Sequence, residues 1–178
     1  MVPDLITFAK GVTSGYVPLG GVAINEAIYA TFADRVYPGG LTYSGHPLAT
    51  ACAVATINAM ADEGMVGNAA RIGTDVLGPA LRELAARHPS VGEVRGLGVF
   101  WAIELVADQA TREPLAPYGG SSPAMAAVLP ACKSGGLLPF ANFNRIHAVP
   151  PCNVTDDEVA EALRILDAAL DVADEHAR

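Results

Sequence analysis

Apolar and polar positions divide the first part of the chain into short strands, Gly-rich loops and helices. Residues 1–8 combine a Pro turn with an apolar run, which predicts an extended strand. The Gly-rich stretch 10–21 predicts a loop, and residues 22–24 resume a short apolar strand. A helix capped by Asn25 is expected over residues 25–34. The chain therefore starts as a mixture of strands and helices.

Two longer helices are expected next. Residues 48–61 are rich in Ala and apolar on all sides, which predicts a helix that is buried on most faces. Pro47 suits the first helical position because its backbone angle is already helical. A second helix is expected from residue 68 to residue 87, ending before Pro89. Three residues inside this second helix predict a kink or break: Gly73, Gly78 and Pro79.

Strands return after Pro89. Residues 91–98 and 99–106 predict two strands of a hairpin, and residues 108–123 predict a polar surface loop. The last helix has the clearest start, because Thr155 and Glu158 have the spacing of a capping box. Before it, a helix is expected at 124–134 and short strands at 137–139 and 145–149. The final amphipathic helix is expected at 155–175.

The change of pattern near Pro89 predicts two domains. The first, residues 1–88, is expected to be an α/β part. The second, residues 89–178, is expected to be a compact α+β part. The overall fold class is therefore α/β.

Charge and hydropathy restrict the function classes. Eleven Lys and Arg residues against nineteen Asp and Glu residues give a net charge of −8, with no basic cluster, so a nucleic-acid partner is not expected. No apolar run approaches the ~18 residues that a membrane span requires. No secretory signal is recognisable at the N-terminus, so a cytoplasmic location is the default expectation.

The three cysteines do not indicate a disulfide framework or a metal site. Cys52, Cys132 and Cys152 are odd in number and lack the spacing of zinc ligands. We expect them to be small buried apolar side chains, and we expect no metal.

Lys10 is the first candidate for chemistry. It follows an apolar strand and precedes a Gly-rich loop, where an ammonium group loses part of its hydration. An unprotonated lysine amine forms a Schiff base with a carbonyl group. Taken alone, the pattern also fits an ordinary solvated lysine.

Thr42 and its neighbours form the second candidate. Residues 41–47 place hydroxyl groups and a glycine directly before a helix, where side-chain oxygens and free backbone N–H groups converge on an anion. The alternative is simple N-capping of that helix by Ser44 or His46.

Arg145 is the third candidate. It lies in a short apolar strand and needs an anionic partner there. A substrate carboxylate held by two parallel hydrogen bonds meets that need, and so does a structural salt bridge to one of the acidic residues.

The order of these motifs resembles the class-III (ω-type) aminotransferases, which use pyridoxal 5′-phosphate (PLP). The resemblance extends over essentially the whole chain. Five stretches carry it, in the order of the family: Pro3 to Gly11, Gly15 to Gly21, Thr42 to Ala49, Arg95 to Gly98, and Asn144 to Pro151.

The resemblance implies roles at the matching positions. Lys10 matches the catalytic lysine, which binds the cofactor as a Schiff base and later moves a proton at the substrate α-carbon. Thr42 matches the threonine that binds the cofactor phosphate of the neighbouring subunit, which implies a homodimer. Arg145 resembles the arginine that receives the substrate carboxylate. Gly20 and Gly21 resemble the turn that closes the lysine loop, and Arg95 belongs to a structural motif.

The implied fold is the C-terminal portion of a fold-type-I PLP enzyme: part of the large domain, followed by the small domain. The family places a phosphate loop, an aromatic residue that stacks on the cofactor and the acid for its pyridine nitrogen before the lysine motif. None of these is recognisable here, so the 178-residue chain is expected to have little activity alone and to expose apolar surface on the helix at 48–61.

The implied reaction transfers an amino group from an amine, an amino acid or a taurine-like compound to a 2-oxo acid such as pyruvate. Two alternatives stay open. One is an aminomutase of the same fold, which needs no 2-oxo acid. The other is a non-catalytic module that associates with a separate N-terminal half.

Overall fold

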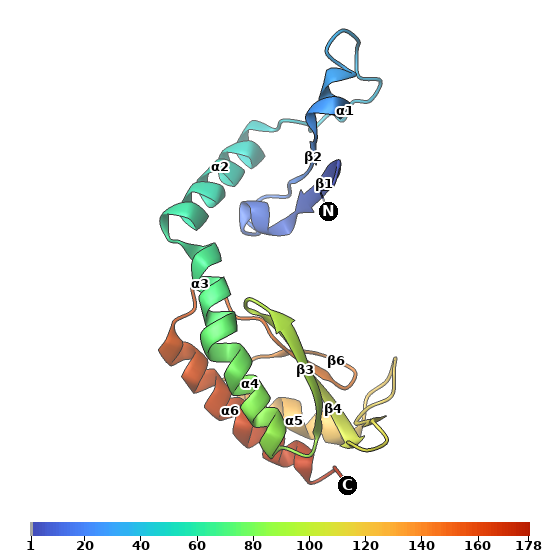
Figure 1. Ribbon diagram of the computed structural model, residues 1–178, viewed down its shortest axis with the longest axis vertical. Coiled ribbons are helices and arrows are strands. Elements are labelled where there is room, and N and C mark those ends of the chain that lie inside the picture. Colours follow the sequence, from blue (N-terminus) through green and yellow to red (C-terminus); the bar gives the residue numbers. More distant parts are fainter. Residues whose placement is uncertain (1) are drawn as a thin grey trace. The chain divides into compact units, whose positions relative to one another are not determined.

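The computed structural model describes residues 2–178, which form two compact units (Figure 1). The first ends at Glu63, and the second runs from Gly64 to Arg178. This division lies earlier in the chain than the predicted boundary between residues 88 and 89. The packing of the helices that follow Gly64 explains the difference.

The first unit is built around a pair of antiparallel strands. Strand β1 (Leu5–Ala9) pairs with β2 (Gly20–Ile24), and the 3-10 helix η1 (Lys10–Thr13) begins directly after β1. Asn25 caps helix α1 (Glu26–Ala30) as predicted, since its Oδ1 accepts a hydrogen bond from the N–H of Ile28 at 2.9 Å. Helix α1 is shorter than expected, because residues 31–34 continue only as turns.

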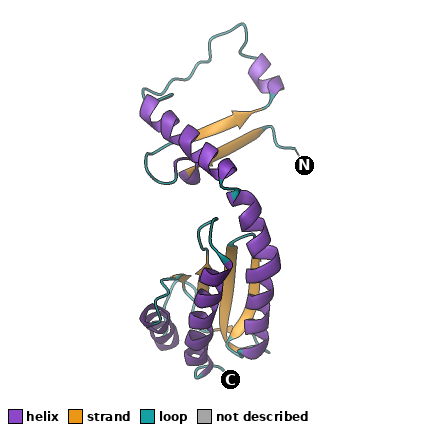
Figure 2. Cartoon of the chain, turned by 90° about the vertical axis from the view of Figure 1, so that its left-hand side faces the viewer, coloured by secondary structure: helices purple, strands orange, loops and turns teal. Residues whose placement is uncertain are grey.

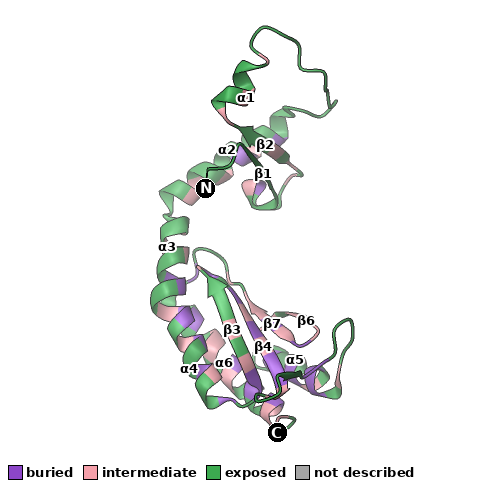
Figure 3. Ribbon diagram, turned by 45° about the vertical axis from the view of Figure 1, so that its right-hand side comes forward, coloured by how far each residue is buried: buried purple, intermediate pink, exposed green. Residues whose placement is uncertain are grey.

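Helix α2 (Pro47–Asp62) begins at Pro47 as predicted. Its predicted burial is wrong for this structure, because Ala49 and Ala53 are its only buried residues. Leu48 and Val54 are 63% and 58% exposed, and most of the helix is coloured as exposed in Figure 3. The expectation that this helix leaves apolar surface uncovered is therefore confirmed.

The helical stretch after Gly64 belongs to the second unit. It consists of α3 (Met65–Arg71), the π-helical segment η2 (Ile72–Leu77) and α4 (Gly78–Arg87). The predicted kink is thus a change of helix type, and the backbone stays helical throughout. The buried side chains form a stripe that faces the core of the second unit, which explains the position of the division: Ile72, Leu77, Leu81 and Leu84.

The second unit has an antiparallel sheet with strand order β3-β4-β7-β6. Helices α4, α5 and α6 lie against one face of it (Figure 2). The strands and the other two helices are β3 (Val91–Leu97), β4 (Phe100–Asp108), β5 (Glu113–Pro114), β6 (Phe140–Asn142), β7 (Arg145–Ala148), α5 (Pro123–Ser134) and α6 (Asp156–Asp174). The predicted hairpin and the capping box of α6 are confirmed. The mixed α/β architecture confirms the predicted fold class.

The strand expected at residues 137–139 is wrong. Strand β6 begins at Phe140, one residue after Pro139. Proline has no N–H to donate to a sheet, so the pairing starts only beyond it.

Close contacts explain why glycine occupies position 96, beside Arg95, and position 73 in η2. A Cβ at Gly73 would lie 2.0 Å from the carbonyl oxygen of Gly98. A Cβ at Gly96 would lie 2.4 Å from the ring of Trp101, whose Nε1–H donates to Gly98 O at 2.7 Å. The tip of the β3–β4 hairpin therefore packs directly on η2, and only glycine leaves room for it.

The cysteines differ in their environments. Cys132 is buried as predicted, Cys52 is partly buried, and Cys152 is exposed, so the prediction is wrong for Cys152. Within residues 2–178, no helix is both long and apolar enough to cross a membrane.

Candidate functional site

Lys10 stands where strand β1 ends and helix η1 begins. Its φ of 54° is in the left-handed region, which is unfavourable for a side chain other than glycine. Such backbone conformations concentrate at functional sites, where the surrounding structure has to enforce them. The side chain is exposed, so the expected loss of hydration is not seen in this chain.

The loop after Lys10 is held from within by Thr13. This residue is 1% exposed, and its Oγ1 donates to the carbonyl oxygen of Val17 at 2.6 Å. Helix α2 adds a second attachment, since Cys52 Sγ donates to Thr13 O at 3.5 Å. Thr13 thus links the lysine loop to α2. The sequence reasoning missed it, although a threonine in a Gly-rich loop is a common source of such local bonds.

A cavity of about 720 Å³ brings the lysine loop together with the segment that contains Thr42. The hydroxyl-bearing residues Tyr43 and Ser44 line it, whereas Thr42 does not. The full lining is Ala9, Lys10, Thr13, Gly15, Val17, Pro18, Leu19, Gly20, Leu41, Tyr43, Ser44 and Gly45.

The alternative explanation for this segment, simple helix capping, is not realised. His46 is the N-cap of α2 and makes no capping hydrogen bond with its side chain. Ser44 is bonded only through its backbone, from its N–H to Leu41 O at 2.9 Å, among the interactions described. The hydroxyl group of Ser44 therefore stays available to a ligand.

Arg145 lies in the second unit, on strand β7. It is directly opposite Glu104 of β4 and Asn142 of β6. Within residues 2–178, no carboxylate oxygen lies within 4.0 Å of its guanidinium nitrogens. The structural salt bridge, which was the alternative for this residue, is therefore not formed.

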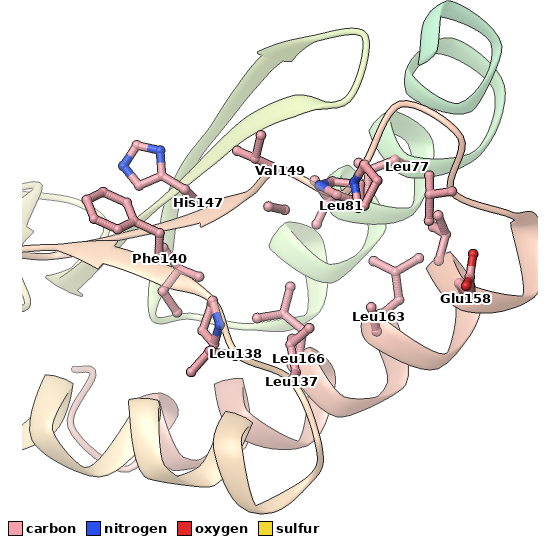
Figure 4. A pocket seen from close by; sticks show the side chains of 18 residues that line it. Leu77, Leu81, Leu137, Leu138, Phe140, His147, Val149, Glu158, Leu163 and Leu166 are labelled. Atoms are coloured by element: carbon pink, nitrogen blue, oxygen red, sulfur yellow. The ribbon is translucent and has the colours of Figure 1, made fainter. Parts of the chain in front are cut away.

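A second cavity, of about 410 Å³, lies in the second unit between α4, α6 and the β6–β7 region (Figure 4). Its labelled side chains are almost all apolar, among them Leu77, Leu81 and Leu163. The carboxylate at its rim, Glu158, is already bound to Thr155 in the capping box. Sequence reasoning missed this cavity, although the apolar stripe of the final helix was a signal for it.

His88 forms a buried ionic cluster that was also missed. The residue is 4% exposed, with Nδ1 2.7 Å from Asp174 Oδ2 and Nε2 2.8 Å from Asp167 Oδ1. Burial opposes the charged ring, but the bonds to the two carboxylates outweigh it and raise the pKa of His88. The signal in the sequence was the spacing of Asp167, Asp171 and Asp174 along one face of a helix.

Comparison with known proteins gives one consistent family. Residues 1–170 match the family described as aminotransferase class-III. The taurine–pyruvate aminotransferase of Bilophila wadsworthia is 32% identical over 180 residues, covering 94% of this chain and 38% of the relative. The putrescine–pyruvate aminotransferase of Pseudomonas aeruginosa is 33% identical over 170 residues, covering 95% of this chain and 36% of the relative.

Solved structures agree with these relatives. The taurine:2-oxoglutarate aminotransferase of Bifidobacterium kashiwanohense, in complex with PLP and glutamate, is 38% identical with a TM-score of 0.89. The match covers 98% of this chain and 39% of that one. The chain thus spans less than half the length of the three proteins compared above.

Proposed function

Because the chain belongs to the class-III aminotransferases, we propose that it supplies the lysine-bearing part of a PLP-dependent transaminase. The proposed enzyme transfers an amino group from an amine or amino acid to a 2-oxo acid such as pyruvate. One observation carries the proposal: Lys10, whose backbone is in the left-handed region, borders the same cavity as the hydroxyl-bearing segment 41–45.

The residues around this cavity fit PLP. An aldehyde needs an amine for covalent attachment, and a phosphate needs hydrogen-bond donors. Lys10 supplies the amine, and Tyr43 and Ser44 supply hydroxyl groups. When bound, PLP accepts the electron pair that is released at the substrate α-carbon.

Lys10 has two proposed roles. Its Nζ would hold the cofactor covalently, and the same Nζ, when free, would act as the base that moves the proton of the substrate α-carbon. The bonds of Thr13 fix the loop that carries it, so the backbone does not have to reorganise between these steps.

Thr42 is the proposed phosphate ligand for the cofactor of a neighbouring subunit. It is exposed and does not line the cavity of its own Lys10. That position suits a residue that acts across a subunit interface, and it supports a homodimer with shared active sites. The cytoplasmic location stays a prediction.

Arg145 is the proposed receiver of the substrate carboxylate. Its guanidinium group lacks a carboxylate partner within the described residues, so two parallel N–H donors stay free for a ligand. Taurine-like compounds, amino acids and simple amines are the proposed donors, in line with the taurine and putrescine aminotransferases among the relatives.

The experiment is covalent trapping of PLP on the 178-residue chain. The chain has two lysines, Lys10 and Lys133, and both are exposed. After borohydride reduction and peptide mapping, we expect the label on Lys10 and an absorbance band of the bound cofactor. Lys10→Arg should abolish both, whereas Lys133→Arg is the matched control and should keep them.

Equal labelling of both lysines would contradict the proposal. Transaminase turnover is a separate prediction. We expect little turnover from this chain alone, because it spans 36–39% of the length of the relatives compared above. Rapid turnover by the mass-verified chain would disprove the prediction of low activity, but it would not contradict the predicted labelling of Lys10.

A further inference from the structure

One face of the sheet in the second unit carries a row of charged side chains. Glu93 lies directly opposite Glu104, and Glu104 lies directly opposite Arg145. Directly paired residues of antiparallel strands point to the same side of a sheet. Two carboxylates therefore stand next to each other in this row, with the Arg145 guanidinium group at its end.

Arg95 bridges the two carboxylates. Its Nη1 lies 3.1 Å from Glu93 Oε2, and its Nη2 lies 3.0 Å from Glu104 Oε2. Arg112 adds a second cation, with Nη2 2.9 Å from the same oxygen of Glu93. The hydrogen bond to Glu104 is the largest cause of the raised pKa of Arg95. The carboxylates of Glu93 and Glu104 are thus neutralised by Arg95 and Arg112, without any contribution from Arg145.

The backbone beside Arg145 is fixed. Asn144 is buried, and its Nδ2 donates to Leu105 O at 2.8 Å. The carbonyl oxygen of Asn144 accepts from the N–H of Leu105, also at 2.8 Å. Strand β7 therefore stays in register with β4. With the backbone fixed, the side-chain conformation of Glu104 decides whether this carboxylate pairs with Arg145.

We propose that Arg95 is a positioning residue for Arg145: by holding Glu104, it leaves the Arg145 guanidinium group free for the carboxylate of a substrate. This inference rests on the proposed role of Arg145. Without Arg95, Glu104 loses its partner and turns to the cation on the opposite strand. It then competes with the substrate for Arg145. Because these side chains are partly exposed, the competition has a several-fold effect and does not abolish binding.

The test measures the reactivity of Arg145 toward phenylglyoxal in the folded chain, mapped by peptide mass spectrometry. In the wild type, Arg145 should react faster than Arg95. In Arg95→Gln, the rate at Arg145 should fall about threefold, as expected for one new exposed ion pair. In the double variant Arg95→Gln with Glu104→Gln, the rate at Arg145 should return to the wild-type value. In the conservative variant Arg95→Lys, the lysine should still hold Glu104, so the rate at Arg145 should stay at the wild-type value.

Arg112→Gln is the matched control, because it removes a cation of the same network that contacts Glu93 and not Glu104. It should leave the rate at Arg145 unchanged. An unchanged rate in Arg95→Gln, or a double variant as slow as the single one, would overturn the inference.

A second arm separates this inference from the proposed function. Pyruvate is added during the modification of the wild type, and a carboxylate that binds Arg145 should slow its reaction. No protection, with the pattern of the variants intact, would count against the substrate role of Arg145 alone. Protection without any effect of Arg95→Gln would count against the positioning role alone.

Discussion

At the scale of single residues, His88 shows how a buried charge is kept. Both ring nitrogens face carboxylate oxygens, so both have to carry a proton to donate. The cluster connects the end of α4 to α6, and the N–H of Ser90 donates to Asp174 Oδ1 at 3.1 Å as a further link. This geometry makes the stability of the second unit depend on pH.

The sign of that dependence follows from the two pKa shifts. The pKa of His88 is raised, so its contribution is complete below the ordinary histidine pKa and is lost as pH rises through the folded value. The hydrogen bond from His88 lowers the pKa of Asp167, whose contribution is complete above the ordinary aspartate pKa and is lost as pH falls through the folded value. The cluster should therefore stabilise most at mildly acidic pH.

We predict that His88→Gln lowers the free energy of unfolding by about 2 kcal/mol near pH 5.5, the range for hydrogen bonds to charged groups. The deficit should shrink as the pH is raised through the raised pKa of His88, where the wild-type ring loses its proton. Urea denaturation across this pH range measures it. His176→Gln is the control, because His176 is exposed. A deficit that does not vary with pH would disprove the prediction.

At the scale of elements, the contact between η2 and the β3–β4 hairpin decides how the second unit packs. It requires glycine at position 73, since a Cβ there would overlap the Gly98 carbonyl group. Trp101 completes the contact, with the Arg82 guanidinium carbon 5.3 Å from the centre of its ring. Gly73 lies in the π-helical segment η2, so the tip of the hairpin meets the chain where the helix changes type.

We predict that Gly73→Ala lowers the free energy of unfolding by about 2 kcal/mol, the typical cost of overpacking. Gly67→Ala is the matched control: it is also a helical glycine, and nothing lies within 4 Å of its added Cβ. That variant should be neutral or more stable by about 0.5 kcal/mol, because alanine favours a helix. Thermal and urea unfolding of the two variants test the pair, and equal stability would contradict the close approach.

At the scale of the whole molecule, we expect the apolar side chains exposed on α2 to promote association. Leu48, Val54 and Ile57 are each more than half exposed on this helix. Large exposed apolar patches favour protein–protein contact. We expect the isolated chain to self-associate, as the sequence already indicated.

We predict that Val54→Glu shifts the chain toward monomer in sedimentation velocity at micromolar concentration, because it places a charge beside Ile57, one helical turn away on the exposed surface of α2. Asn58→Glu is the matched control: it adds the same charge to the same helix at an exposed position that is already polar, so it should shift the distribution less. A wild-type chain that is monodisperse and monomeric would disprove the expectation.

Sequence patterns were enough to predict several local elements and the family. The capping box at Thr155, the Asn25 cap and the hairpin after Pro89 depend on neighbours in the chain, so local chemistry predicts them. The ordered motifs around Lys10, Thr42 and Arg145 indicated the aminotransferases, and the family match confirms that family.

Features that depend on partners distant in the sequence were settled by packing. The stretch 65–87 joined the second unit because its apolar stripe is buried against that unit's core. The same holds for the His88 cluster and for the Arg145 guanidinium group, which has no carboxylate within 4.0 Å among residues 2–178. Each depends on which side chains packing brings within bonding distance. Sequence periodicity indicates which face of an element is buried, but only the packed chain decides which element covers it.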